Sequence, residues 1–116
     1  MSFVTDVLLC TALGDGASTK DSRLNANVLS DWLVEHYGPA CALEKLSSYA
    51  GGNKAMQADV FGVAVNFCNR EKLIAVFQAI SWQYPESAQL LLKHEDSDSF
   101  QLYAIADAML AERSNA

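Results

Sequence analysis

Cysteine, proline and positive charge are all scarce in this sequence. Only three of the 116 residues are cysteine and two are proline. An odd number of widely spaced cysteines does not build a disulfide framework, so we expect reduced, structural thiols and a cytoplasmic protein. No apolar run approaches the roughly 18 residues that span a bilayer. The apolar start of the chain lacks a basic segment and carries Asp6, which argues against a signal peptide.

The shortage of positive charge limits the classes of partner. Eight lysine and arginine residues stand against fourteen aspartate and glutamate residues, and the formal net charge is −6. Phosphate backbones repel such a surface, so we expect no direct nucleic-acid binding. A basic protein is the partner that this charge favours, although negative charge also serves solubility alone.

The composition is that of a folded protein. Hydrophobic residues make up 51% of the chain and charged residues 19%, which indicates a globular chain with a buried core. A chain of this length is expected to form one domain, residues 1–116.

The order of apolar runs and turn signals predicts the secondary structure. Helices are expected at residues 23–37, which Gly38 and Pro39 end, and at residues 70–82, with Asn69 as the N-terminal cap. The second helix must end by Tyr84, because the residue before a proline is disfavoured in helical conformation. Extended runs are expected in four segments: 4–13, 54–67, 89–93 and 100–105.

Residues 41–49 fit either a helical stripe or a short, irregular edge strand, and we favour the strand. Gly62 indicates a bulge or a close approach of the backbone. The resulting order is β-α-β-β-α-β, with an extra C-terminal strand and a short terminal helix at 106–113. It predicts an α+β, two-layer sandwich of the ferredoxin-like type. Such a sheet has one open face, which a second subunit could cover.

Complete catalytic, metal or nucleotide motifs are missing. The glycine-containing segment 13–20 follows a strand and precedes a helix, but it completes neither phosphate-binding glycine fingerprint. A cysteine–histidine active site would need a thiol beside His36 or His94, and the spacing does not favour one. Cys68 is the one thiol with a reason for a lowered pKa, since it precedes a helix. We therefore predict no cofactor, no metal, no catalytic residues and no enzymatic activity.

The densest charge lies at the tip of the last hairpin, in His94, Glu95, Asp96 and Asp98. These groups fall short of the spacing of a calcium loop. They could dock onto lysine and arginine side chains of a partner, or they could form only a solvated turn.

Four aromatic residues are candidates for the same surface or for the core: Trp82, Tyr84, Phe100 and Tyr103. Trp82 is expected to fill the core between helix and sheet. Tyr84 and Tyr103 are expected to pack beside the acidic tip in an interface, because aromatics with a polar group are enriched at binding hot spots.

These observations favour a non-enzymatic protein–protein interaction module. Its concrete form is a small acidic inhibitor or immunity protein that occludes a basic partner, such as a toxin or a nucleic-acid-binding protein. One alternative is a homodimeric regulatory domain that binds a small ligand and pairs through the open sheet face. That hypothesis predicts apolar residues on both faces of the strands, with Val60 and Phe61 pointing to opposite sides. A second alternative is a small enzyme of unknown reaction.

Overall fold

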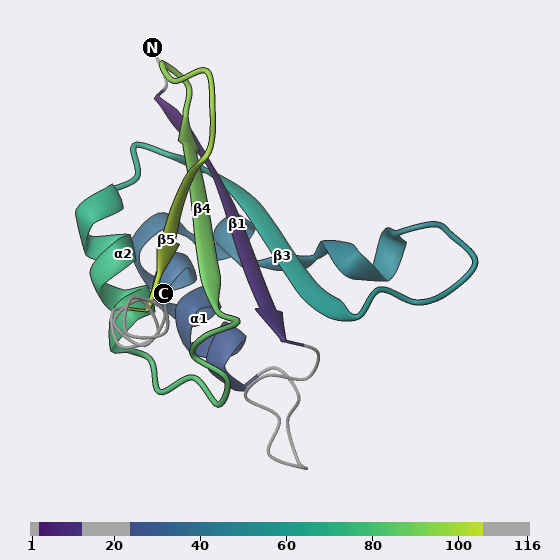
Figure 1. The fold of residues 1–116 in the computed structure, drawn as a ribbon. Helices are drawn as coiled ribbons and strands as arrows, with labels where there is room; N and C mark the ends of the chain where they lie inside the picture. Colours follow the sequence, from purple (N-terminus) through teal and green to yellow (C-terminus); the bar gives the residue numbers. More distant parts are fainter. Residues whose placement is uncertain (1–2, 13–23, 106–116) are drawn as a thin grey trace.

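The computed structural model describes residues 3–12 and 24–105. Within these ranges the chain forms five strands and two α-helices (Figure 1): β1 (Val4–Ala12), α1 (Leu24–Tyr37), β2 (Glu44–Lys45), β3 (Ala58–Asn66), α2 (Arg70–Ala79), β4 (Gln89–His94) and β5 (Gln101–Ala104). The predicted terminal helix at 106–113 and the glycine-containing segment 13–20 lie outside the described residues.

The five strands form one antiparallel sheet in the order β2-β3-β1-β4-β5. The first strand is therefore central, as its nearly continuous apolar sequence predicts. The two last strands pair with each other, so the predicted C-terminal hairpin is confirmed. Together with the two helices this makes an α+β fold with an open sheet.

One face of the sheet packs against both helices, which lie behind it in Figure 1. Alternate residues of β1 point to this side, and Val7 and Leu9 are almost completely buried. Four helix residues with no exposed surface pack in the same core: Leu29, Leu33, Leu73 and Phe77. Their spacing of four residues within each helix places each pair on one face.

The opposite face carries the alternate residues and is not covered by either described helix. Phe61 of β3 is 1% exposed on the helix side, whereas its neighbour Val60 is only partly buried. The prediction that these two residues point to opposite sides is confirmed. Leu8 and Leu91 are neighbours on the open face, because β1 and β4 pair at these positions.

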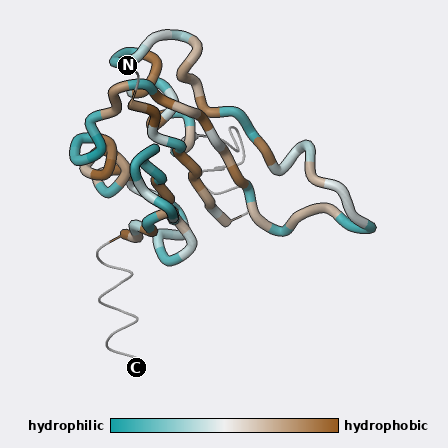
Figure 2. Tube along the Cα trace, turned by 90° about the horizontal axis from the view of Figure 1, so that it is seen from above, coloured by the Kyte–Doolittle hydropathy of each residue, from teal (hydrophilic) through white to brown (hydrophobic). Residues whose placement is uncertain are grey.

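Residues 41–49 contain less strand than predicted. Only Glu44 and Lys45 pair with β3, and short 3₁₀ helices, Pro39–Cys41 and Leu46–Tyr49, flank them. The following strand begins at Ala58 and not at residue 54, because residues 50–57 form a loop that projects from the sheet (Figure 1). The far end of this projection is hydrophilic (Figure 2), which explains why it stays outside the core.

The second helix is shorter than predicted. Asn69 caps it as expected, with its side-chain oxygen accepting a hydrogen bond from the Lys72 N–H at 3.1 Å. The helix ends at Ala79, and Ile80 is already extended. Trp82 turns back into the core, where its Nε1–H donates to the Phe77 carbonyl at 3.0 Å. Its buried position confirms the prediction for Trp82 and explains the early end of the helix.

Gly62 does not form a bulge. Strands β1 and β3 pair without interruption through this position. A Cβ atom there would lie 2.7 Å from Leu46 Cδ1 and 3.2 Å from Leu8 Cδ2. The glycine therefore admits two leucine side chains on the open face, and the approach that the sequence predicts comes from side chains and not from a neighbouring backbone.

Candidate interaction site

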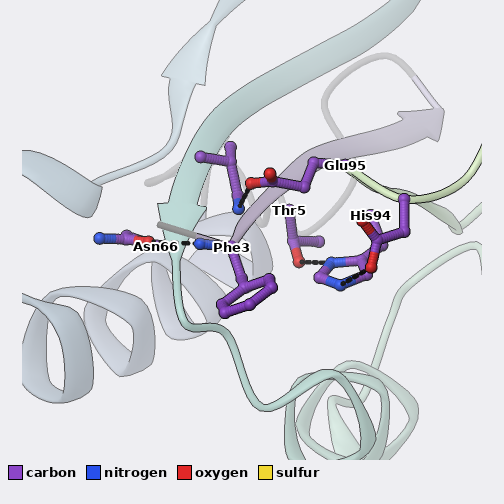
Figure 3. A network of polar contacts seen from close by, with 7 residues as sticks. Phe3, Thr5, Asn66, His94 and Glu95 are labelled. Carbon is purple, nitrogen blue, oxygen red and sulfur yellow. Dashed lines mark hydrogen bonds and ion pairs between the residues drawn. The ribbon is translucent and has the colours of Figure 1, made fainter. Parts of the chain in front are cut away.

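The start of β1 and the end of β4 lie side by side at one end of the sheet. Thr5 pairs with His94, so the residue after the strand, Glu95, meets Val4 on the neighbouring strand. The Glu95 N–H donates to the Val4 carbonyl at 2.9 Å, and the Glu95 carboxylate accepts from the Val4 N–H (Figure 3). Glu95 thus holds the first strand in place through both its backbone and its side chain.

Phe3 is held from the other side. Its N–H donates to Asn66 Oδ1 at 3.1 Å (Figure 3), and its carbonyl accepts from the Phe67 N–H at 3.0 Å. The Phe3 ring stands edge-on to the Phe67 ring, with centroids 5.7 Å apart, and is stacked on His94 at 6.4 Å. Three aromatic rings, from the residue before β1, the end of β4 and the segment after β3, therefore meet at this end.

Two of these rings are exposed to solvent. Phe3 is 38% exposed and Phe67 is 59% exposed. Phe67 also has a φ of 56°, and no other non-glycine residue with positive φ occurs among the described residues. A bulky residue adopts this left-handed conformation at an energetic cost of about 1–2 kcal/mol. The conformation turns the chain after β3 and leaves the Phe67 ring exposed beside Phe3.

The turn that follows β4 is ordered by its own hydrogen bonds. The Ser97 N–H donates to the His94 carbonyl at 2.8 Å. The Ser97 hydroxyl donates to the Ser99 carbonyl at 3.0 Å and accepts from the Ser99 N–H at 3.3 Å. The carboxylates of Asp96 and Asp98 consequently extend from a defined turn.

His94 links this turn to the sheet. Its Nδ1 lies 3.5 Å from Thr5 Oγ1, and its Nε2 lies 3.8 Å from a carboxylate oxygen of Asp96 (Figure 3). The second distance is too long for a hydrogen bond. Since the Asp96 side chain is 76% exposed, its carboxylate remains accessible to a partner.

The structure brings four of the six predicted partner-binding residues together: His94, Glu95, Asp96 and Asp98. Their roles differ, because Glu95 fastens the first strand whereas Asp96 and Asp98 face solvent.

The two predicted tyrosines lie elsewhere. Tyr84 precedes β4 and so lies at the end of that strand opposite to the acidic turn. Tyr103 pairs with Leu90, packs against the core and donates its hydroxyl to Gln101 Oε1 at 2.9 Å. Neither contributes to the surface around the turn.

Phe3 and Phe67 take the place that the sequence analysis gave to the tyrosines. We define the acidic–aromatic end by five residues: Phe3, Phe67, His94, Asp96 and Asp98. Comparison of the chain with protein-family models, with curated proteins and with solved structures finds no match.

Two of the three thiols are partly buried in ways that affect their pKa values. Burial raises the pKa of the Cys68 thiol, and this effect outweighs the hydrogen bond from Tyr37 and the nearby Arg70, which both lower it. The helix N-terminus gave Cys68 a reason for a lowered pKa, but burial of this thiol after the end of β3 has the larger effect. Burial raises the pKa of the Cys10 thiol as well.

Three other kinds of feature bear on function in the described part of the chain: metal-binding groups, membrane-spanning helices and pockets. Residues 3–12 and 24–105 contain no group of three or more side chains that could hold a metal ion. No helix in these ranges is long and apolar enough to cross a membrane. A hollow of about 320 Å³ lies at the base of the projecting loop, but Lys45 and Asp59 on its wall already pair at 3.4 Å.

Proposed function

We propose that this protein is a non-enzymatic interaction module, a small acidic inhibitor whose acidic–aromatic end binds a basic partner. The observation that carries the proposal is Phe67, an exposed aromatic ring held in left-handed conformation beside two exposed carboxylates. Aromatic residues, phenylalanine included, are enriched in protein interfaces, where a few well-buried anchors supply most of the binding energy. The carboxylates supply attraction to a positively charged surface.

In the proposed mechanism, charged residues speed the association of the partner and aromatic residues hold it once it is bound. The net charge of −6 and the exposed Asp96 and Asp98 draw a basic partner toward this end and raise the association rate. Phe3 and Phe67 then lose their exposed apolar surface to the partner. A toxin or a nucleic-acid-binding protein covered in this way can no longer admit its own phosphate-bearing substrate, so an immunity protein is the concrete form.

The ordered turn supports this mechanism. Its three internal hydrogen bonds hold the aspartates before binding takes place. Glu95 and Asn66 fasten the strand that presents Phe3. A surface that is already in its binding conformation loses less entropy when the partner arrives.

A finer fold assignment also belongs with this proposal. The neighbours β2-β3-β1-β4, with α1 after β1 and α2 after β3, support a ferredoxin-like arrangement with β5 added beside β4. In this arrangement the acidic–aromatic end lies at one end of the sheet and does not overlap the open face.

The test compares capture of a basic protein from a lysate of the source organism by three forms of the chain. The site variant carries Asp96→Lys and Asp98→Lys. The control carries Asp31→Lys and Glu35→Lys, the same change in charge on exposed residues of α1. We expect the wild type and the control to capture the same basic protein, and the site variant to lose it.

Kinetic measurements on the captured protein complete the test. The association rate should fall as salt is added, because exposed charges are screened. A replacement of Phe67 by serine should mainly raise the dissociation rate. Equal capture by the wild type and the site variant would contradict the proposal.

A further inference from the structure

The open face of the sheet has a self-complementary order of side chains. One row runs across four paired strands: Gly62 of β3, Leu8 of β1, Leu91 of β4 and Leu102 of β5. It begins with a residue that has no side chain and ends with a leucine that is 56% exposed. The next row contains Asp6 and Lys93, which are neighbours on β1 and β4.

We propose that this face binds a second copy of the chain around a two-fold axis that runs along the strands between β1 and β4. The proposal is independent of the function proposed above, because it uses a different surface. Such an axis exchanges β1 with β4 and β3 with β5. The two-fold arrangement is the commonest in homo-oligomers, and it requires a surface that complements itself.

The axis brings opposite charges together. Asp6 of each copy lies over Lys93 of the other, so two pairs of opposite charge form at once. Asp6 is exposed, and neither residue forms an ion pair with another residue in the described ranges. The charges are therefore available to a partner copy, and the same arrangement would be repulsive if both positions had one sign.

The axis also brings apolar side chains together. Leu8 lies over Leu91 of the other copy, and Leu102 lies over the Gly62 position, where Leu46 and Leu8 of the first copy meet. A hollow of about 360 Å³ adjoins Gly62, lined by Asp6, Leu8, Leu46, Ala64 and Phe100 among others. Leu102 of the second copy fits this hollow, since most of its wall is apolar side chain.

The size of the face agrees with a dimer of moderate strength. Four strands about 4.8 Å apart and about 25 Å long give roughly 500 Å² in projection on each copy. Two copies would bury about 1,000 Å², near the lower limit for a specific interface. We therefore expect a dimer that forms with increasing concentration, with the two sheets packed face to face as in a β-sandwich.

The test uses two variants, each of which reverses the sign of one of the two charges. Asp6→Lys alone gives a chain with two lysines on the face, and Lys93→Asp alone gives a chain with two aspartates. Each variant should be monomeric at concentrations where the wild type is dimeric by analytical ultracentrifugation. An equimolar mixture of the two should form a heterodimer, because each lysine then meets an aspartate of the other chain.

The mixture distinguishes contacts between chains from contacts within one chain. Each variant keeps its like charges side by side in its own sheet, so recovery on mixing must come from the partner. Circular dichroism checks that each variant is folded. Glu35→Lys, on the helical layer, is the control and should leave the dimer unchanged.

A second variant tests the packing without altering the charged row. Leu102→Asp lies on an exposed edge strand and should abolish the dimer without loss of fold. A wild type that stays monomeric at millimolar concentration would overturn the proposal, as would charge variants that remain dimeric. A mixture that remains monomeric would equally overturn the proposed axis.

Discussion

At the scale of single residues, Phe67 combines two unfavourable properties, an exposed apolar ring and a left-handed backbone. Phe67 is the last residue of the extended run predicted at 54–67. The strand ends one residue earlier, and the chain reverses at Phe67. Asparagine and glycine are the usual residues with positive φ, so nothing in the residue type of Phe67 indicated this conformation.

Replacement of Phe67 should have little effect on the stability of the protein, as expected for a residue that serves binding and not packing. Phe67→Gly removes a strain of about 1–2 kcal/mol and an edge contact with Phe3 of about 0.5–1.5 kcal/mol. We expect the free energy of unfolding to change by less than about 1 kcal/mol, because these two effects oppose each other. Phe77→Ala in the core is the comparison and should cost about 3–5 kcal/mol. Urea denaturation measures both, and equal losses would show that Phe67 is a packing residue.

At the scale of elements, boundaries set by one side chain were predictable and boundaries set by packing were not. Asn69 begins α2 with its own oxygen, and Gly38 follows α1 with a φ of 103°. The end of α2 depends on Trp82 returning to Phe77, which requires the finished core. The acidic turn was likewise predictable from its residue types, whereas its aromatic neighbours come from distant segments of the chain.

The cap at Asn69 gives a prediction for α2. Asn69→Ala removes the acceptor for the Lys72 N–H and should destabilise the protein by about 1 kcal/mol. Asn69→Asp keeps an acceptor and is the matched control, with less than half of that loss expected. Urea denaturation of the two variants checks this. The Asn69 N–H also donates to the Tyr37 hydroxyl at 2.8 Å, and that bond should survive in both variants because it uses only the backbone. If Asn69→Asp lost as much stability as Asn69→Ala, the capping role of Asn69 would be contradicted.

At the scale of the whole molecule, three partly buried groups should make the stability of the protein decrease at alkaline pH. Burial raises the pKa of the Cys10 and Cys68 thiols and of the Tyr37 hydroxyl. Each group favours its neutral form in the folded state. The folded protein therefore holds these protons more tightly than the unfolded chain does, and stability must fall when they dissociate.

The stability of the folded protein should decrease as the pH rises. The contribution of each group is complete below the pKa of the unfolded chain, near 8.5 for cysteine and 10 for tyrosine. It is lost as the pH rises through the higher pKa of the folded protein. Urea denaturation in a reducing buffer should show constant stability at neutral pH and a decline above about pH 8.5. Cys68→Ser should reduce the slope, and stability that rises over this range would contradict the assignment.

The central position of β1 has a consequence for the order of events during synthesis. This strand leaves the ribosome before its neighbours β3 and β4, and Glu95 follows both of them. A nascent chain thus carries this apolar strand without either partner until residues 58–66 and 89–94 have been made. Pairing between such distant segments is slow. The newly made chain is therefore exposed to aggregation until β4 emerges, and chaperones that shield apolar segments have their natural target in residues 4–12.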